Sequence, residues 1–420
     1  MNKVKVVDAI CGAGKSTHII NHMRENPDKR WMYVTPYLSE AGDGDSKNEK
    51  GRIRESLPEL DFQCPSGSKS ESLKKILADG KNVAITHALL TLIDKETLEV
   101  IKTHDYHLVI DETLDVISVY KGIHSDDIRG MIGNYVIKDE QSGKLTWNYE
   151  LYGDSYKGHF KELKDLCDMD CLYIHKGNVL INKLSPVIMQ SAKSVTVLTY
   201  MFEGSFMCAW LRMAGVEYEH VPLNSGFDPE VIKQSVKDNL VVLPTPKSIF
   251  NMNYDDRGLV LNGAFSSTWY KGRTAKELNH IKKGVQSSLT QLRKKGIQHK
   301  IFWTTFKNYQ EVLVGTGYKK GTVVSEDGEL VEPFVSKNKR ASNTHAECNT
   351  CVYLVNVFAH GDIASYLQGQ GINVDNDSLA ISEMVQFIFR GSIRRGETMY
   401  LMVASERMKK LLLEWLEEPS

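Results

Sequence analysis

Short apolar runs alternate with amphipathic stretches through the first half of the chain. Strands are predicted where β-branched and aromatic residues cluster, and the stretches between them carry the apolar spacing of helices. Strands that alternate with helices predict a parallel sheet with right-handed crossovers, and therefore an α/β fold. The predicted strands lie at residues 4–7, 30–34, 82–85, 106–110 and 194–199.

The same alternation returns in the second half of the chain. Strands are predicted at 240–243, 258–261, 299–303, 352–357 and 399–404, and helices at 274–296, 379–390 and 406–417. A polar stretch with Gly and Pro at 222–238 is predicted to be the linker between the halves. The sequence therefore predicts two α/β domains, at 1–225 and 226–420.

The long gap between the strands at 106–110 and 194–199 predicts an insertion at about 120–190, because a plain βα unit spans only ~30 residues. The insertion is polar and rich in aromatic residues. These residues could stack on nucleic-acid bases or form a small core of their own, and the core is the commoner outcome. The aromatic residues are Tyr135, Trp147, Tyr149, Tyr152, Tyr156 and Phe160.

Composition narrows the class of protein. The chain has 420 residues, 41% of them hydrophobic, and a net charge of −1, so a passive, strongly basic coat for nucleic acid is excluded and any such contact must be local. No apolar run reaches the ~18 residues that span a bilayer, and the chain enters its first strand at once, which predicts a cytoplasmic protein without a membrane partner.

Seven cysteines, an odd number, fit reduced thiols better than a set of disulfides. Cys167/Cys171 and Cys348/Cys351 are close pairs of a kind that can ligate zinc. Their spacings differ and they lie far apart in sequence, so buried thiols are the better interpretation.

Residues 4–17 read VKVVDAICGAGKST, a predicted strand, a turn of small residues and the start of a helix. Backbone N–H groups in such a loop and at the helix N-terminus converge on one point and bind phosphate. Lys15 adds a charge for the β- and γ-phosphates, and the Ser16 hydroxyl can ligate Mg²⁺. The first Gly of the general P-loop pattern is Ala9 here. The predicted phosphate-binding residues are Gly12, Ala13, Gly14, Lys15, Ser16 and Thr17.

Asp111-Glu112 follows the apolar strand at 106–110. In a parallel sheet the functional loops leave the carboxyl ends of the strands, so this pair is expected at the same edge as the P-loop. Asp111 can hold Mg²⁺, and Glu112 can orient or deprotonate the attacking water. An ordinary acidic loop is the alternative.

The second half has no P-loop, but it contains Gln386 followed by Arg390 and Arg394. The apolar spacing predicts that this stretch is helical, which would place the two Arg on one face. Guanidinium groups aimed at a γ-phosphate stabilise the charge that develops during transfer. Beside a P-loop, such arginine fingers are favoured over a solvated basic helix.

Taken in order, A-x-x-G-x-G-K-S, V-T-P, I-T-H-A-L, V-I-D-E-T, L-T-Y-M-F, W-T-T-F and Q-x-x-x-R-G-x-x-R resemble the motif series of superfamily 2 DExx-box helicases. The ending looks like that of compact phage-encoded members. The resemblance implies two tandem RecA-like domains, ATP and Mg²⁺ as cofactors, and a nucleic-acid strand across both domains.

By this resemblance Lys15, Asp111, Glu112, Gln386, Arg390 and Arg394 are catalytic, and Ser16 and Asp111 hold the metal. The residues that would contact the strand backbone are Thr35, Pro36, Thr86, His87, Thr304, Thr305 and, from a weaker match to motif V, Asn343 and Thr344. Motif VI usually spaces its two Arg by three, so Arg394 and Arg395 both stay candidates for the second finger.

The leading interpretation is an ATP-dependent helicase or translocase. Its partner would be single-stranded, forked or branched DNA, with RNA less favoured, and a monomer in the cytoplasm of a host cell is the working expectation. A nucleic-acid-stimulated ATPase that remodels protein–DNA complexes without processive unwinding is the alternative. A nucleotide kinase fits less well, because such enzymes have no second RecA-like half.

Overall fold

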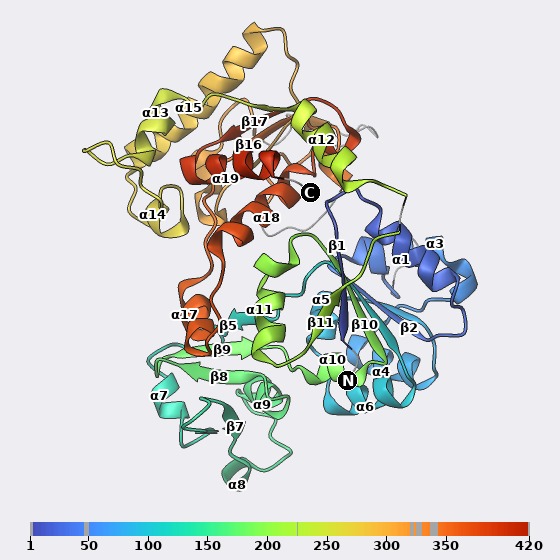
Figure 1. Ribbon diagram of the computed structural model, residues 1–420. Coiled ribbons are helices and arrows are strands. Elements are labelled where there is room, and N and C mark those ends of the chain that lie inside the picture. Colours follow the sequence, from blue (N-terminus) through green and yellow to red (C-terminus); the bar gives the residue numbers. More distant parts are fainter. Residues whose placement is uncertain are drawn as a thin grey trace. The chain divides into compact units, whose positions relative to one another are not determined.

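The structure is a computed structural model that describes residues 3–45, 50–224, 226–319, 323–324, 330–336 and 343–418. The chain forms two compact units (Figure 1). Unit 1 contains residues 1–9, 14–225 and 359–374, and unit 2 contains residues 10–13, 226–358 and 375–420. Unit 1 thus includes a segment from the part of the sequence predicted to be the second domain. No helix of the described residues is long and apolar enough to cross a membrane.

Unit 1 is built on a six-stranded sheet in which every pairing is parallel. The strand order is β11-β1-β10-β4-β2-β3. The strands are β1 (Val4–Asp8), β2 (Trp31–Thr35), β3 (Val83–Thr86), β4 (His107–Asp111), β10 (Ser194–Thr199) and β11 (Tyr218–His220). The predicted strands of the first half are all present, with bounds shifted by a residue or two.

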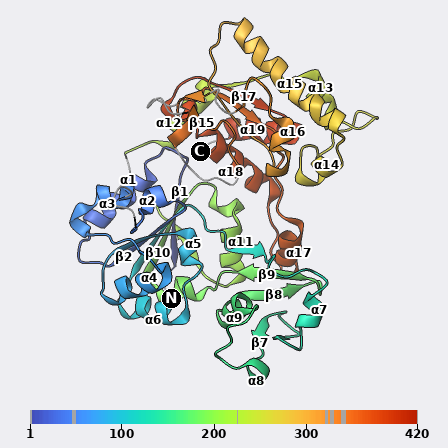
Figure 2. The ribbon, with the colours of Figure 1, turned by 180° about the vertical axis from the view of Figure 1, so that it is seen from behind.

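Helices cover both faces of this sheet (Figure 2). Successive residues of a strand point to opposite faces, and accordingly Val6 and Val34 join one hydrophobic core while Val7 and Tyr33 join another. The second core is closed by α1 (Lys15–Arg24) and α3 (Arg52–Ser56). The first is closed by α4 (Lys69–Ala78), α6 (Lys95–Thr103), α10 (Val187–Ser191) and α11 (Phe206–Met213).

The predicted insertion is a small subdomain of unit 1. It contains an antiparallel sheet of order β5-β9-β8 and a hairpin of two further strands. The elements are β5 (Ile117–Val119), α7 (Ile128–Met131), β6 (Val136–Lys138), β7 (Leu145–Trp147), α8 (Tyr149–Tyr152), α9 (Lys161–Asp168), β8 (Leu172–His175) and β9 (Val179–Lys183).

Most aromatic residues of the insertion form a core of their own. Trp147 is buried, and Tyr135, Tyr152, Tyr156 and Phe160 pack around it. The rings of Tyr135 and Tyr152 stack with centroids 4.6 Å apart. The core interpretation is therefore the correct one for these residues, and only Tyr149 remains exposed among those named.

Unit 2 contains a four-stranded parallel sheet of order β12-β17-β16-β13. Its strands are β12 (Leu240–Val242), β13 (Ile301–Thr304), β16 (Thr350–Tyr353) and β17 (Met399–Val403). Its helices are α12 (Pro229–Asn239), α13 (Lys247–Phe250), α14 (Ser267–Lys271), α15 (Ala275–Lys294), α16 (Gln310–Leu313), α18 (Asn376–Ile388) and α19 (Glu406–Glu417). Two parallel sheets flanked by helices confirm the predicted fold class.

One local expectation for this unit was wrong. Residues 258–261 form no strand, because the chain reverses at Gly258 (φ +77°) and a single bridge joins Tyr254 to Val260. The predicted linker at 222–238 contains the boundary between the two units, at 225/226, and also most of α12, whose first turn begins with Pro229 and is capped by the Asp228 side chain. Proline is favoured at that position because the N–H it lacks has no partner within a helix.

Short elements complete the chain. The helices are α2 (Leu38–Ala41) and α5 (His87–Leu90), and β14 (Val323–Val324) pairs with β15 (Leu330–Val331). The 3₁₀ turns are η1 (Pro58–Leu60), η2 (Phe202–Gly204), η3 (Asn251–Asn253), η4 (Lys307–Tyr309), η5 (Asn343–His345) and η6 (Ser392–Arg395).

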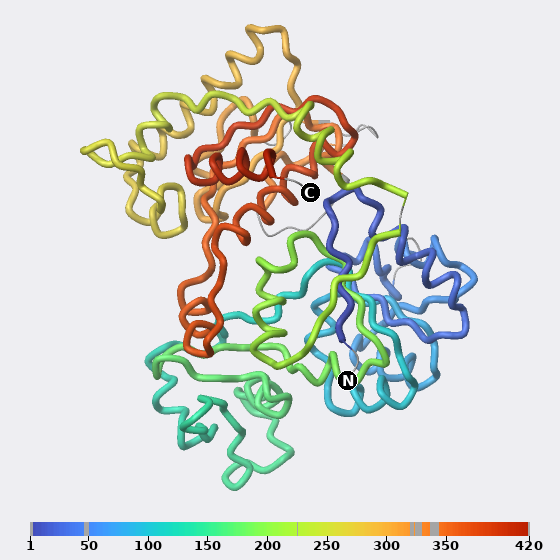
Figure 3. Tube along the Cα trace, viewed as in Figure 1, coloured from blue at the N-terminus to red at the C-terminus, as the bar shows by residue number. Residues whose placement is uncertain are grey.

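Residues 359–374, which we call the arm, contain α17 (Gly361–Gly369) and belong to unit 1. In Figure 3 the arm is the orange segment beside the green strands of the insertion. Three apolar side chains of the arm are buried in the unit 1 core: Ile363, Tyr366 and Leu367. The Tyr366 and His175 rings are nearly perpendicular with centroids 5.7 Å apart, and His175 Nε2 lies 2.9 Å from Ser365 Oγ.

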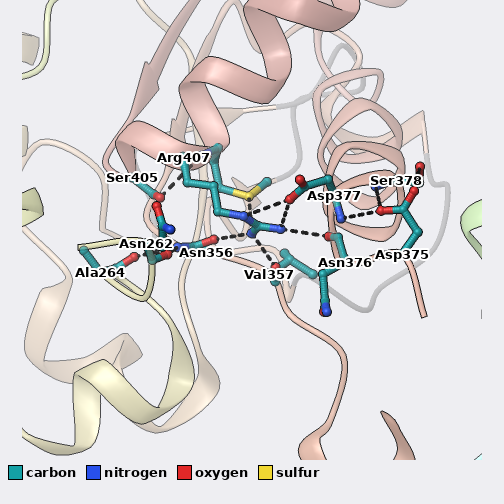
Figure 4. Close-up of polar contacts among 11 residues, drawn as sticks. Asn262, Ala264, Asn356, Val357, Asp375, Asn376, Asp377, Ser378, Ser405 and Arg407 are labelled. Atoms are coloured by element: carbon teal, nitrogen blue, oxygen red, sulfur yellow. Dashed lines mark hydrogen bonds and ion pairs between the residues drawn. The ribbon is translucent and has the colours of Figure 1, made fainter. Parts of the chain in front are cut away.

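The root of the arm lies in unit 2, where Arg407 joins the segment before the arm to the segment after it (Figure 4). Its guanidinium donates to Asn356 Oδ1 at 2.7 Å and to the Val357 carbonyl at 2.9 Å. It also donates to the Asn376 carbonyl at 2.9 Å and to Asp377 Oδ1 at 2.5 Å. One half-buried side chain from α19 thus holds both ends of the excursion together.

Candidate functional site

The loop between β1 and α1 has the backbone that a phosphate cradle needs. Gly12 and Gly14 have φ of +87° and +81°, in the left-handed region that favours glycine. A Cβ at Gly12 would meet nothing within 4 Å, so conformation and not space requires glycine there. Among the described residues no side chain caps α1. Its first N–H groups therefore suit an anion.

Lys15 opens α1 and is only 8% exposed. Its ammonium donates to the carbonyl of Ala9 at 2.5 Å, so the side chain folds back over the loop. Ser16 is half-buried and Thr17 is exposed. These positions fit the group that the resemblance implies, with the ammonium and the helix N-terminus on the phosphates and the Ser16 hydroxyl available to a cation.

The strand register brings the acidic pair to the same edge of the sheet as the P-loop. β10 lies between β1 and β4, with Asp8 paired to Thr199 and Leu198 paired to Asp111. Neighbouring strands lie ~4.8 Å apart, so the ends of β1 and β4 are separated by roughly 10 Å. A hydrated cation bound to a phosphate can bridge such a gap.

Asp111 is held by a buried tyrosine that the sequence did not single out. Tyr33 is fully buried and its hydroxyl donates to Asp111 Oδ2 at 2.8 Å. Burial raises the pKa of Asp111, while the hydrogen bond from Tyr33 and the charge of Arg52 act in the opposite direction. Burial, the Asp111 charge and the hydrogen bond to Asp111 raise the pKa of Tyr33 well above its usual value, so it stays a donor. From the sequence alone, a tyrosine in the middle of an apolar strand predicts only a core residue.

Glu112 adopts a left-handed backbone conformation, with φ of +66°. For a residue other than Gly, Asn or Asp this costs on the order of 1–3 kcal/mol, and such outliers cluster at functional sites. Its N–H donates to the Leu198 carbonyl at 2.8 Å, which ties the acidic pair to β10.

The residues predicted to contact a nucleic-acid strand lie mainly inside the two units. Thr35, Thr304 and Thr305 are at most 1% exposed. Pro36, Thr86 and His87 are half-buried, and His87 Nε2 lies 2.9 Å from the carbonyl oxygen of Asp111. Their role in strand contact stays a prediction.

The match to motif V lies at the other end of its strand from the loops that carry function. Asn343 and Thr344 are in η5, which comes before β16, and therefore lie toward the amino end of that strand. The functional loops of a parallel sheet leave the carboxyl ends. Thr344 is exposed, and the side chain of Asn343 lies outside the described residues.

The predicted helical face of two arginines does not exist. α18 ends at Ile388, Arg390 lies in the turn that follows, and Arg394 belongs to the separate η6. Beyond the end of the helix, Gly391 packs so closely that a Cβ would lie 2.7 Å from the Cys348 carbonyl oxygen and from the Phe302 ring. The Ser392 N–H then donates to that carbonyl.

The three arginines are therefore in different environments. Arg390 is 5% exposed, with its guanidinium 4.8 Å from the centroid of the Phe387 ring. Arg394 and Arg395 are exposed, and Arg395 pairs with Glu397 at 3.1 Å. Gln386 lies in the last turns of α18 and donates to Ser382 Oγ at 3.1 Å.

The cysteines that were candidate zinc ligands are buried thiols. Cys167, Cys171, Cys348 and Cys351 are buried, which raises the pKa of Cys167 to about 12 and that of Cys171 to about 11. Within the described part of the chain, no group of three or more His, Cys, Asp or Glu side chains is placed to hold a metal ion.

A curated relative spans the whole chain. It is the SPbeta prophage-derived uncharacterized protein YonV of Bacillus subtilis (strain 168), 31% identical over 435 residues that cover 99% of both chains. The chain belongs to the YonV family. Residues 117–182 match the YonV middle domain, and residues 246–416 match the YonV C-terminal Rossmann-like domain. The middle domain of the family thus coincides with the insertion.

Among solved structures, S. tokodaii Xpd4 is similar over 99% of this chain and 94% of its own, with a TM-score of 0.52 and 12% identity. This likeness concerns the fold. The DUF1998 helicase MrfA bound to DNA is similar over 99% of this YonV-family chain and 46% of its own chain, with a TM-score of 0.40 and 12% identity. That score is too low to support an argument.

Proposed function

We propose that this YonV-family protein is an Mg²⁺-dependent ATP hydrolase that works as a motor on a nucleic-acid strand. One observation carries the proposal: the loop and helix start that contain Lys15 follow β1, and the Asp111-Glu112 pair stands at the end of β4, at the same edge of one parallel sheet with β10 between these two strands. A strand–turn–helix alone could bind any anion. The acidic pair at the same edge adds what hydrolysis of a nucleoside triphosphate needs, a cation site and a group to orient water.

Each residue at this edge has a distinct task in the proposal. The N–H groups at the start of α1 bind the phosphates, and Lys15 turns from Ala9 toward the β- and γ-oxygens. The Ser16 hydroxyl and the Asp111 carboxylate would hold Mg²⁺, which when bound neutralises charge on the phosphates. Glu112 orients the attacking water or accepts its proton.

Arg390 is the strongest candidate for an arginine finger. Its guanidinium is buried and oriented by the Phe387 ring, whereas Arg395 already pairs with Glu397 and Arg394 is exposed. A guanidinium with a fixed orientation stabilises developing charge without first losing side-chain entropy. Gln386 lies in α18, before Arg390 in the sequence, and would contact the same phosphate.

The nucleic-acid partner is proposed from the order of the motifs, and the near-neutral net charge indicates that contact is confined to a local track. Contacts to phosphates by loop N–H and hydroxyl groups would make binding independent of sequence. Single-stranded or forked DNA is the first substrate to test.

The test is steady-state ATP hydrolysis with no nucleic acid, with single-stranded DNA, with a forked duplex and with RNA. Lys15→Ala serves as the blank for contaminating activity. Stimulation by DNA together with strand separation of the fork supports the motor. Stimulation without strand separation points to the ATPase that remodels protein–DNA complexes, and a rate that no nucleic acid changes contradicts the motor.

A further inference from the structure

The segment that follows β10 lies between the two halves of the proposed ATP site. β10 separates the P-loop strand β1 from the acidic strand β4, and η2 (Phe202–Gly204) follows β10 closely. Residues 198–202 are therefore placed to contact both strands. The resemblance had marked this stretch as a motif without naming anything that holds it.

Asp8, the last residue of β1, holds this segment directly. Its Oδ1 accepts the N–H of Met201 at 2.7 Å, and its Oδ2 accepts the N–H of Phe202 at 2.8 Å. Hydrogen bonds to a charged acceptor are about twice as strong as neutral ones. Because both oxygens are used on successive amides, the carboxylate fixes the direction of the turn as well as its distance from β1.

The backbone of this turn is in a conformation that needs support. Met201 has φ of +56°, and it is one of seven described non-glycine residues with positive φ, as is Glu112. Phe202 anchors the far side of the turn, since its side chain is fully buried. A strained residue persists only where its surroundings determine it, and Asp8 supplies that determination here.

Two further hydrogen bonds connect the segment to the site on each side. The Ala9 N–H donates to the Thr199 carbonyl at 3.0 Å, and Ala9 is the residue whose own carbonyl receives Lys15. On the other side, the Glu112 N–H donates to the Leu198 carbonyl at 2.8 Å. A continuous run of hydrogen bonds thus leads from Lys15 through residues 198–202 to Glu112.

We infer that Asp8 is a positioning residue for ATP hydrolysis: it fixes the segment at 198–202 and, through that segment, the position of Glu112 relative to the P-loop. The inference rests on the proposed function. It adds a residue that lies outside the helicase-like motifs and that would touch neither the nucleotide nor the metal.

The charge and shape of the side chain make the inference specific. A cap that served stability alone would work nearly as well with Asn, which is as good a cap as Asp. At Asp8, however, each carboxylate oxygen accepts a different N–H, and an Asn amide would place an NH₂ donor against one of these two N–H groups. Asp8→Asn should therefore change the orientation of the segment at 198–202 without creating a cavity, since the two side chains have nearly the same volume.

The experiment compares Asp8→Asn with wild type and with Asp94→Asn. Asp94 is a matched control, because its carboxylate also accepts a backbone N–H, that of Thr97 at 2.8 Å, but it caps α6. For Asp8→Asn we expect kcat to fall by about tenfold or more while KM for ATP changes by less than about twofold. Asp94→Asn should leave both constants unchanged, and thermal melting should be recorded for all three proteins.

A double-mutant cycle separates positioning from a general loss of structure. If Asp8 acts through Glu112, then Asp8→Asn should have almost no further effect on the residual rate of Glu112→Gln. Multiplying effects in that background would overturn the inference, as would an unchanged kcat for Asp8→Asn. If Asp8→Asn fails to fold, Asp8→Glu is used in the same cycle, since it keeps both oxygens and shifts them by one methylene.

The failure of this inference can be told from a failure of the proposed function. If wild type neither binds nor hydrolyses ATP, the function and the inference fall together. If wild type hydrolyses ATP and the Asp8 variants hydrolyse it at the wild-type rate, the proposed function stands and the inference alone is overturned.

Discussion

The two parallel sheets end in carboxyl edges of opposite character. At the edge of the unit 1 sheet, Lys15 opens α1, Asp111 ends β4, and Glu112 follows Asp111 with a strained backbone. At the edge of the unit 2 sheet, Thr304 and Thr305 are buried, and the segment after β16 is held by Arg407. The same kind of sheet therefore carries proposed chemistry in one unit and an anchorage in the other.

The difference shows what the loops after a strand are used for. In unit 1 the loop after β1 returns at once as α1, which leaves its N-terminus for an anion. In unit 2 the chain after β16 leaves for the arm and returns at the start of α18. The hydrogen bonds of Arg407 hold the two ends of that excursion together, and Arg390 follows only where α18 has ended.

Substitution of Lys15 should have the largest effect on the first edge. In Lys15→Ala the charge for the β- and γ-phosphates is gone, so we expect ATP hydrolysis to fall by more than about 10³-fold. Steady-state phosphate release measures it. The control is Lys102→Ala, an exposed lysine on α6, which should retain the wild-type rate. A Lys15→Ala protein with substantial activity would contradict the assignment of the P-loop.

Arg390 tests whether the second edge contributes to chemistry at all. For Arg390→Ala we expect turnover to fall on the order of 10³-fold, as for the loss of an arginine finger. Arg395→Ala is the matched control, since its partner Glu397 is exposed and two residues away, and it should change turnover by less than about threefold. Equal ATP turnover in the two variants would contradict the assignment of Arg390 as an arginine finger. Melting curves for both exclude unfolding as the cause.

Substitution of Arg407 tests whether its hydrogen bonds hold the root of the arm in unit 2. Arg407→Ala breaks hydrogen bonds to Asn356, Val357, Asn376 and Asp377, and we expect it to lower the free energy of unfolding of unit 2 by about 3 kcal/mol. Urea denaturation measures the change. Lys410→Ala, on the same helix with its side chain 76% exposed, should shift stability by less than about 0.5 kcal/mol. If both variants unfold at the same urea concentration, Arg407 does not hold the root of the arm.

Tyr33 should give the smallest of these effects and refines the first edge. Tyr33→Phe removes only the hydroxyl that donates to Asp111, so we expect kcat to fall by about tenfold, equivalent to ~1.4 kcal/mol. Tyr106→Phe is the control, because that buried hydroxyl donates at 2.6 Å to the Lys81 carbonyl, away from the carboxyl edge of the sheet. A wild-type kcat in Tyr33→Phe would show that Asp111 needs no such support.

Local patterns predicted the elements that depend on neighbours in sequence. The strand at 194–199 and the helix at 406–417 have the predicted bounds, because alternation and helical spacing act over a few residues. The P-loop was predicted for the same reason, since strand, glycines and helix start follow one another. The insertion was predicted from its length alone.

The failures arose where distant residues set the local structure. The helix through Arg390 was predicted from apolar spacing, but it ends at Ile388, and Gly391 beyond it packs against Cys348 and Phe302, a contact that no local pattern contains. The apolar side chains of the arm, Ile363, Tyr366 and Leu367, show from sequence only that a helix buries one face. Which core they enter is decided by the fold.

Sequence alone was enough for the succession of strands and helices, for the two-part α/β architecture and for the residues that propose an ATP site, because each is written in adjacent positions. The order of the strands was beyond it. Only the tertiary structure places β10 between β1 and β4, brings the Tyr33 hydroxyl to Asp111 across 78 positions and joins Asp8 to Met201 across 193. Hydrogen bonds between residues so far apart carry no periodicity in the chain, and they exist only once the sheet has formed.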